Sequence, residues 1–218
     1  MFANFAIDLF VTAATFGHLA GYNYFLSIAP GSNLITASVA AFQSGRDIWR
    51  EKYIKDLASY LLTLPVPRRV FAMSRITGGV ARSLIATFPG TLVISFLYGI
   101  LVSPRLIEAY VIVGVFSLGI VGLSMAVSAF ASTIEVFATV RSAIQLYLSF
   151  LSTVFYPVNV FPSIVQPLVQ ANPMTWAVEA FRTLGQGGST LVPVSILVVP
   201  SLVFALLGMV CYLWYARL

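Results

Sequence analysis

Charge is scarce in this chain of 218 residues. Asp, Glu, Lys and Arg make up 9% of it and hydrophobic residues 59%, whereas an ordinary soluble domain is about a quarter charged. There is one cysteine and one histidine, so neither an intrachain disulfide nor a His/Cys metal cluster can form. These absences exclude a soluble catalytic domain and favour an integral membrane protein, for which 218 residues leave room for about six helical spans.

Six apolar runs predict an all-α, polytopic membrane protein with a single transmembrane domain over residues 1–218. The runs cover about residues 1–19, 32–44, 76–102, 109–132, 143–160 and 191–215. We expect a kink-prone segment at residues 21–31, with the first two runs forming a helical hairpin, and a break in the third run at Pro89 and Gly90. The first run lacks a basic leader and contains Asp8, which indicates a membrane helix rather than a signal peptide.

Eight of the twelve Lys and Arg residues lie between Gly45 and Arg82, the longest polar interval of the chain. Basic residues of polytopic proteins concentrate in cytoplasmic loops. With this loop inside, ten basic residues face the cytoplasm and only Arg105 and Arg182 face the far side. The count predicts cytoplasmic termini in a plasma (inner) membrane, with a lipid bilayer rather than a nucleic acid as the partner of the basic residues.

An amphipathic helix is predicted within residues 46–62, in a cytoplasmic loop that covers about residues 45–75. Its apolar residues recur about every four positions, and Pro65 and Pro67 follow it. The stripe consists of Trp49, Tyr53, Leu57 and Leu61, widened by Ile48, Ile54 and Ala58. Composition favours a helix resting in the lipid headgroup layer, and the alternative is a docking helix for a partner protein.

The segment of about residues 156–184 contains too many prolines for one continuous helix. Irregular backbone at membrane depth needs protein or a water-filled cavity around it, so a re-entrant segment of short helices is expected before the last span. The segment is predicted to gate an exit path on the far side, although Glu179 and Arg182, at spacing i, i+3, are also explained by simple pairing on a short helix. The candidate gate residues are Pro157, Asn172, Pro173, Glu179 and Arg182.

Several short strings follow one another along nearly the whole chain. They are Ala29-Pro30-Gly31, Arg50-Glu51 with Leu61-Leu62, Leu64-Pro65-Val66-Pro67-Arg68, Phe155-Tyr156-Pro157, Phe161-Pro162, and Asn172-Pro173-Met174-Thr175 with Glu179 and Arg182. In this order they resemble the permease subunits of ABC-2 type transporters, a family of exporters. The amphipathic interfacial helix that such permeases place before the first span is not found in this sequence, so we expect either a truncated start or a permease without that helix.

The resemblance implies that the segment from Trp49 to Leu61, with Arg50 and Glu51 among its contacts, is a coupling helix bound by a separate ATP-binding subunit. It also implies a second contact near Glu135 and Arg141, for which a solvated turn with an ion pair is an equal alternative. It further implies two permeases and two ATP-binding subunits, with the permeases forming a homodimer or a heterodimer.

ATP chemistry is not expected on this chain. The sequence has no Gly-x-x-x-x-Gly-Lys-Ser/Thr string, so the chain is predicted to be a transport subunit and not an enzyme, with no cofactor of its own and with ATP and Mg2+ on the partner. The alternative is an ion-coupled secondary transporter that uses Asp8. An intramembrane protease built on His18 and Ser124 is disfavoured, because no second histidine is available as a base.

Overall fold

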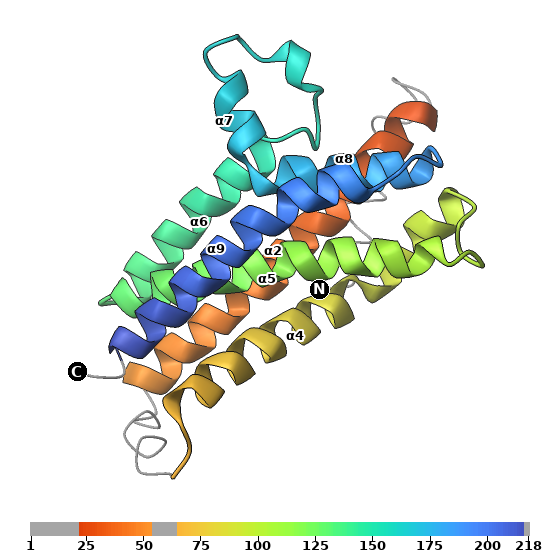
Figure 1. The fold of residues 1–218 in the computed structure, drawn as a ribbon. Helices are drawn as coiled ribbons and strands as arrows, with labels where there is room; N and C mark the ends of the chain where they lie inside the picture. Colours follow the sequence, from red (N-terminus) through yellow and green to blue (C-terminus); the bar gives the residue numbers. More distant parts are fainter. Residues whose placement is uncertain (1–21, 54–64, 216–218) are drawn as a thin grey trace.

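The structure is a computed structural model that describes residues 22–53 and 65–215. Over these ranges the chain forms seven α-helices and one short 3-10 helix, and no strand (Figure 1). The predicted all-α fold is thus confirmed for the described residues. The elements are α2 (Tyr22–Tyr53), α4 (Arg68–Leu97), α5 (Arg105–Phe130), α6 (Ile134–Phe150), η1 (Val158–Val160), α7 (Gln166–Ala171), α8 (Pro173–Gly185) and α9 (Leu191–Tyr215).

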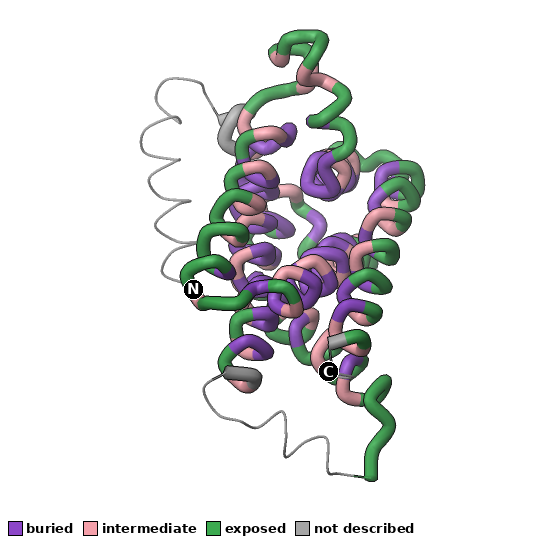
Figure 2. Tube along the Cα trace, turned by 90° about the vertical axis from the view of Figure 1, so that its left-hand side faces the viewer, coloured by how far each residue is buried: buried purple, intermediate pink, exposed green. Residues whose placement is uncertain are grey.

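Helix α5 is the centre of the bundle, packed against α9, α2, α4 and α8. Glycine permits its closest approach: a Cβ on Gly122 would lie 2.3 Å from the Phe204 carbonyl oxygen, and one on Gly208 would lie 2.2 Å from the Gly122 carbonyl oxygen. Small residues commonly let membrane helices approach in this way. Figure 2 shows buried residues on the inner faces of the helices and exposed residues on their outer faces.

Three helices of the described residues, α4, α5 and α9, are long and apolar enough to cross a membrane. The last apolar run is confirmed, because α9 covers the expected residues 191–215. The first run lies outside the described residues, so six spans and the hairpin stay predictions.

The bounds expected for the second and third runs are wrong. The second run, expected at 32–44, is the middle of α2, which is 32 residues or about 48 Å long. In the third, α4 continues through Pro89 without a break. Proline removes one ladder hydrogen bond, yet α2 is helical through Pro30 and α4 is helical through Pro89.

The fifth run, expected at 143–160, is also shifted: α6 begins at Ile134 and ends at Phe150. At its start the Thr133 Oγ1 accepts a hydrogen bond from the Val136 N–H at 3.3 Å, which is the geometry of an N-cap. Glu135 and Arg141, near which a second partner contact was expected, therefore both lie on a helix. Beyond α6 the chain turns through Pro157 into η1 and α7, which project from the bundle (Figure 1).

Candidate functional site

Arginine side chains gather at one end of the bundle, which we term the basic end. The end of α2, the starts of α4 and α6 and the end of α9 lie together there (Figure 1). Of nine arginines in the described residues, seven are on α2, the first half of α4 or α6, and two, Arg105 and Arg182, are near the opposite end. This separation matches the charge asymmetry on which the orientation was predicted.

Two ion pairs join α2 to α4 at the basic end, and we term them the clasp. Arg82 Nη1 lies 2.6 Å from Asp47 Oδ2, and Arg75 Nη2 lies 2.5 Å from Glu51 Oε2. The partners are four residues apart on α2 and seven apart on α4, so each set occupies one helix face. The clasp therefore fixes the last turns of α2 to α4.

A polar cavity of about 310 Å³ adjoins the clasp and is also lined by Arg50. Arg50 is exposed, whereas Glu51 is partly buried. Of the predicted contacts for an ATP-binding subunit, these two thus differ in environment: Arg50 is accessible and Glu51 is already engaged by Arg75.

Trp49 does not lie on an exposed docking face. Its side chain is 7% exposed and packs against Ala131, in the link between α5 and α6, and against Phe137, in the first turn of α6. The chain's own residues thus cover Trp49 in this structure, and its predicted contact with an ATP-binding subunit stays a prediction. Tyr53 is the last residue of α2, and Ile54, Leu57, Ala58 and Leu61 lie outside the described residues.

The α5–α6 link is the second predicted contact. Glu135 is exposed in the first turn of α6. Hydrogen bonds from its own backbone N–H and from Thr133 lower the pKa of its carboxyl group, which keeps a negative charge on this turn. Within the described part of the chain Glu135 and Arg141 form no ion pair, so that alternative interpretation of the link is wrong.

At the opposite end, Asn172 joins two helices. Its side chain is fully buried. Its Oδ1 accepts a hydrogen bond from the Met174 N–H at 2.9 Å, which caps the start of α8. Its Nδ2 donates to three carbonyl oxygens at the end of α6, those of Tyr147, Leu148 and Leu151, at 3.1, 3.3 and 2.7 Å. Asn172 therefore sets the geometry of the α6–α8 junction.

Arg182 of α8 connects three segments. Its Nη1 pairs with Glu179 Oε1 at 3.0 Å, which confirms the predicted i, i+3 pair. Its Nη2 donates to the carbonyl oxygens of Thr153 at 2.7 Å and Ser27 at 3.2 Å. The guanidinium thus holds α8 against α2 and against the turn that follows α6.

Tyr98, which follows α4, was not anticipated from the sequence. Pro30 has no N–H to donate to the Leu26 carbonyl four residues earlier, and the Tyr98 hydroxyl donates to that carbonyl at 2.9 Å. Burial raises the pKa of Tyr98 to about 12, against the opposing effect of the Arg182 charge. Tyr98 and Arg182 therefore bind adjacent carbonyls of α2 beside Pro30.

The predicted gate residues do not all come together. Asn172, Pro173, Glu179 and Arg182 lie along α8 and its cap, in contact with α2 and the end of α6. Pro157 lies apart from them, before η1 on the exposed loop. Short helices are present in this segment as predicted, and they are separated at Asn172, whereas a re-entrant placement and a gating role stay predictions. Among the described residues no three His, Cys, Asp or Glu side chains group as metal ligands.

Comparison with known proteins assigns most of the chain to a family. Residues 9–184 match the family described as ABC-2 type transporter. Two relatives, from Mycobacterium tuberculosis strains CDC 1551 / Oshkosh and ATCC 25618 / H37Rv, carry the name probable doxorubicin resistance ABC transporter permease protein DrrC. Each is 32% identical over 152 residues, which cover 67% of this chain and 53% of the relative. This chain thus matches about half the length of those relatives, and no solved structure matches it significantly. Since the family match covers most of the residues, the chain belongs to the ABC-2 type transporter family, as its sequence motifs predicted.

Proposed function

We propose that the chain is the permease subunit of an ATP-driven ABC-2 type exporter in the plasma membrane, with both termini in the cytoplasm. A separate subunit binds ATP and Mg2+ and hydrolyses the ATP, and the permease works as a homodimer or as a heterodimer with a second permease. Family membership and the permease name of the relatives support this proposal. So does the sequence, which has no phosphate-binding Gly-Lys-Ser/Thr string.

The observation that carries the proposal is the continuity of α2. This helix runs from the carbonyls bound by Tyr98 and Arg182, through the core, to the clasp at the basic end. A partner that displaces the segment after Tyr53 would therefore act on a helix that directly contacts α8, part of the far-side segment of residues 156–184. A continuous helix fixed at both ends can transmit such a displacement without a separate relay.

In this proposal residues 54–61 supply the docking face of the coupling helix. Trp49 packs against Ala131 and Phe137 and so anchors the end of α2 from which this segment continues, and Arg50 on the same turn is exposed. The far-side segment around α8 covers the exit of the path. The printed name of the relatives makes a drug the first substrate class to test for this chain.

The test is purification of the tagged protein in mild detergent from cells that also produce its ATP-binding partner, followed by an ATPase assay. We expect a P-loop ATPase to co-purify and Leu57→Glu to release it, because a charge on the apolar docking face opposes burial. Val66→Glu is the matched control: it adds the same charge to an exposed residue of the same loop and should leave the complex intact.

Two outcomes would contradict the proposal. One is retention of the ATPase and of efflux by the Leu57→Glu variant. The other is purification of the permease alone with no ATPase, which would favour the secondary-transporter alternative and make Asp8, which lies outside the described residues, the next position to change.

A further inference from the structure

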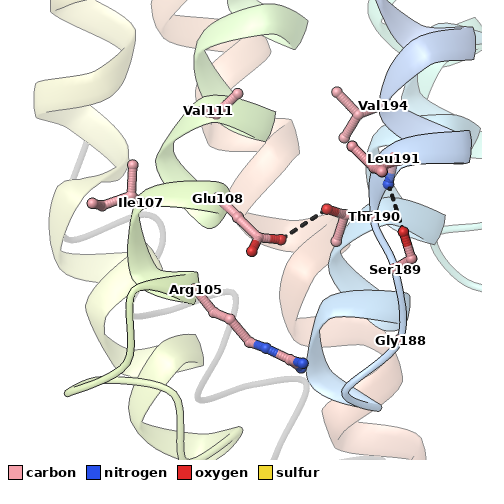
Figure 3. Close-up of a pocket in the computed structure, with 9 residues that line it drawn as sticks. All are labelled: Arg105, Ile107, Glu108, Val111, Gly188, Ser189, Thr190, Leu191 and Val194. Atoms are coloured by element: carbon pink, nitrogen blue, oxygen red, sulfur yellow. Dashed lines mark hydrogen bonds between the residues drawn. The ribbon is translucent and has the colours of Figure 1, made fainter.

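A cavity of about 590 Å³ lies between the start of α5 and the start of α9 (Figure 3). These two helix starts are at the end of the bundle opposite the clasp (Figure 1). This volume falls within the range of small-molecule sites. One part of its wall is charged, with Arg105 and Glu108, and another part is apolar, with Ile107, Val111 and Leu191. Nothing in the coupling or gating scheme uses this cavity.

The two charged side chains are held by neutral partners and not by each other. Arg105 Nη2 donates to the Gly187 carbonyl oxygen at 3.0 Å, and Glu108 Oε2 accepts from Thr190 Oγ1 at 2.8 Å. Figure 3 shows both side chains beside the same cavity. In the described part of the chain Arg105 and Glu108 form no ion pair with one another. Neither side chain is therefore paired with the other, and each has unused hydrogen-bonding capacity for a ligand.

The apolar wall belongs to α5 and α9, two of the helices long and apolar enough to cross a membrane. Ile107 is 68% exposed and Leu191 is 77% exposed, and both lie in the first turns of those helices. In a bilayer these turns would lie where acyl chains meet headgroups. The cavity thus places opposite charges at headgroup depth and an apolar surface below them, which is the pattern of a zwitterionic lipid.

We propose that this cavity binds one ethanolamine phospholipid, with the phosphate on Arg105 and the ammonium on Glu108. An anionic phospholipid would be attracted by Arg105 and repelled by Glu108. An amphipathic cation would be attracted by Glu108 and repelled by Arg105. A choline headgroup carries both charges but has no ammonium N–H to donate to the carboxylate, so it forfeits a charge-assisted hydrogen bond. The proposal does not depend on which substrate the protein transports.

The test is native mass spectrometry of the delipidated full-length protein with phosphatidylethanolamine, phosphatidylcholine and phosphatidylglycerol of identical acyl chains. We expect ethanolamine lipid to bind about tenfold more tightly than the other two, the effect of one charge-assisted hydrogen bond. Glu108→Gln should remove that preference while its amide oxygen still accepts from Thr190. Glu135→Gln makes the same change of charge at the basic end and should leave the preference unaltered.

A second variant separates the cavity from the charge. Val111→Trp fills the cavity without changing any charge and should reduce binding of the ethanolamine lipid about tenfold, with a melting temperature close to that of the unaltered protein. Equal binding of the three lipids, or a preference that survives Glu108→Gln or Val111→Trp, would overturn the proposal. Displacement of the lipid by an equal concentration of glycerophosphoethanolamine, which has no acyl chains, would also overturn it, because the apolar wall would then contribute nothing.

Discussion

Tyr98 supplies the hydrogen bond that Pro30 cannot make. Without its hydroxyl, the Leu26 carbonyl would be left without that donor inside the bundle. We expect Tyr98→Phe to lower the free energy of unfolding by about 1–3 kcal/mol, the usual effect of leaving one buried polar group unsatisfied. Thermal unfolding in detergent measures it, and Tyr156→Phe, which removes a hydroxyl from an exposed ring, should change stability by less than about 0.5 kcal/mol.

The stabilising effect of Tyr98 should depend on pH in the alkaline range. Burial raises its pKa from 10.0 to about 12, so folding favours the neutral hydroxyl. The contribution is then complete below the unfolded pKa of 10.0 and is lost as the pH rises through about 12. The melting temperature of the unaltered protein should therefore approach that of Tyr98→Phe between those two values, and a constant difference across the range would contradict this assignment.

Asn172 marks how far single residues could be predicted. An Asn followed by Pro is a recognised start of a helix, and the structure has α8 starting at Pro173 with Asn172 as its cap. Its three bonds to the end of α6 could not be predicted, because they depend on where the chain returns after a loop of irregular backbone. The hydrogen bonds of Tyr98 to Leu26 and of Arg182 to Thr153 could not be predicted either, because they also join segments that are far apart in the sequence.

At the scale of helices, composition predicted the bounds of α9, the most apolar helix, more accurately than those of α2 and α6. The bounds of α9 were predicted, because an apolar run between polar ends has only one interpretation. The start of α6 was missed, although Thr133 before Ile134 carries an N-cap signal. The stripe at Trp49 was recognised, but periodicity shows that a face is apolar and not which neighbour covers it. In this structure the neighbour is the α5–α6 link.

The clasp is an interaction between elements, and exchanging its charges tests it. Glu51 and Arg75 are 21% and 27% exposed, so we expect Arg75→Glu alone to cost about 1 kcal/mol of stability and to reduce ATP-driven efflux. Adding Glu51→Arg should restore most of both, because the pair is re-formed with its charges reversed.

Melting temperature and efflux from cells give the two measurements for the clasp. The matched control is Arg69→Glu, an exposed arginine of the same helix that has no ion pair in the described part of the chain. The double variant could have the same melting temperature and efflux as Arg75→Glu alone. In that case the pair does not couple α2 to α4, and the proposed transmission of movement along α2 is not supported at the basic end.

At the scale of the whole molecule, the separation of arginine between the two ends predicts orientation in the membrane. Seven of the nine arginines in the described residues lie toward the basic end, and basic residues are retained on the cytoplasmic side during insertion. The lone Cys211 is buried in α9, so a Cys211→Ala background leaves new cysteines as the accessible thiols. Glu135→Cys reports on the basic end and Gln186→Cys on the opposite end, and both positions are exposed.

A membrane-impermeant maleimide should label Gln186→Cys in intact cells and leave Glu135→Cys unlabelled, while inverted vesicles should give the reverse. The two sites lie at opposite ends of the bundle, so they must respond oppositely whichever way the protein inserts. Labelling of Glu135→Cys in intact cells would place the clasp outside the cell. Since ATP-binding subunits need cytoplasmic ATP, that result would remove the coupling role of the basic end even though the family assignment would stand.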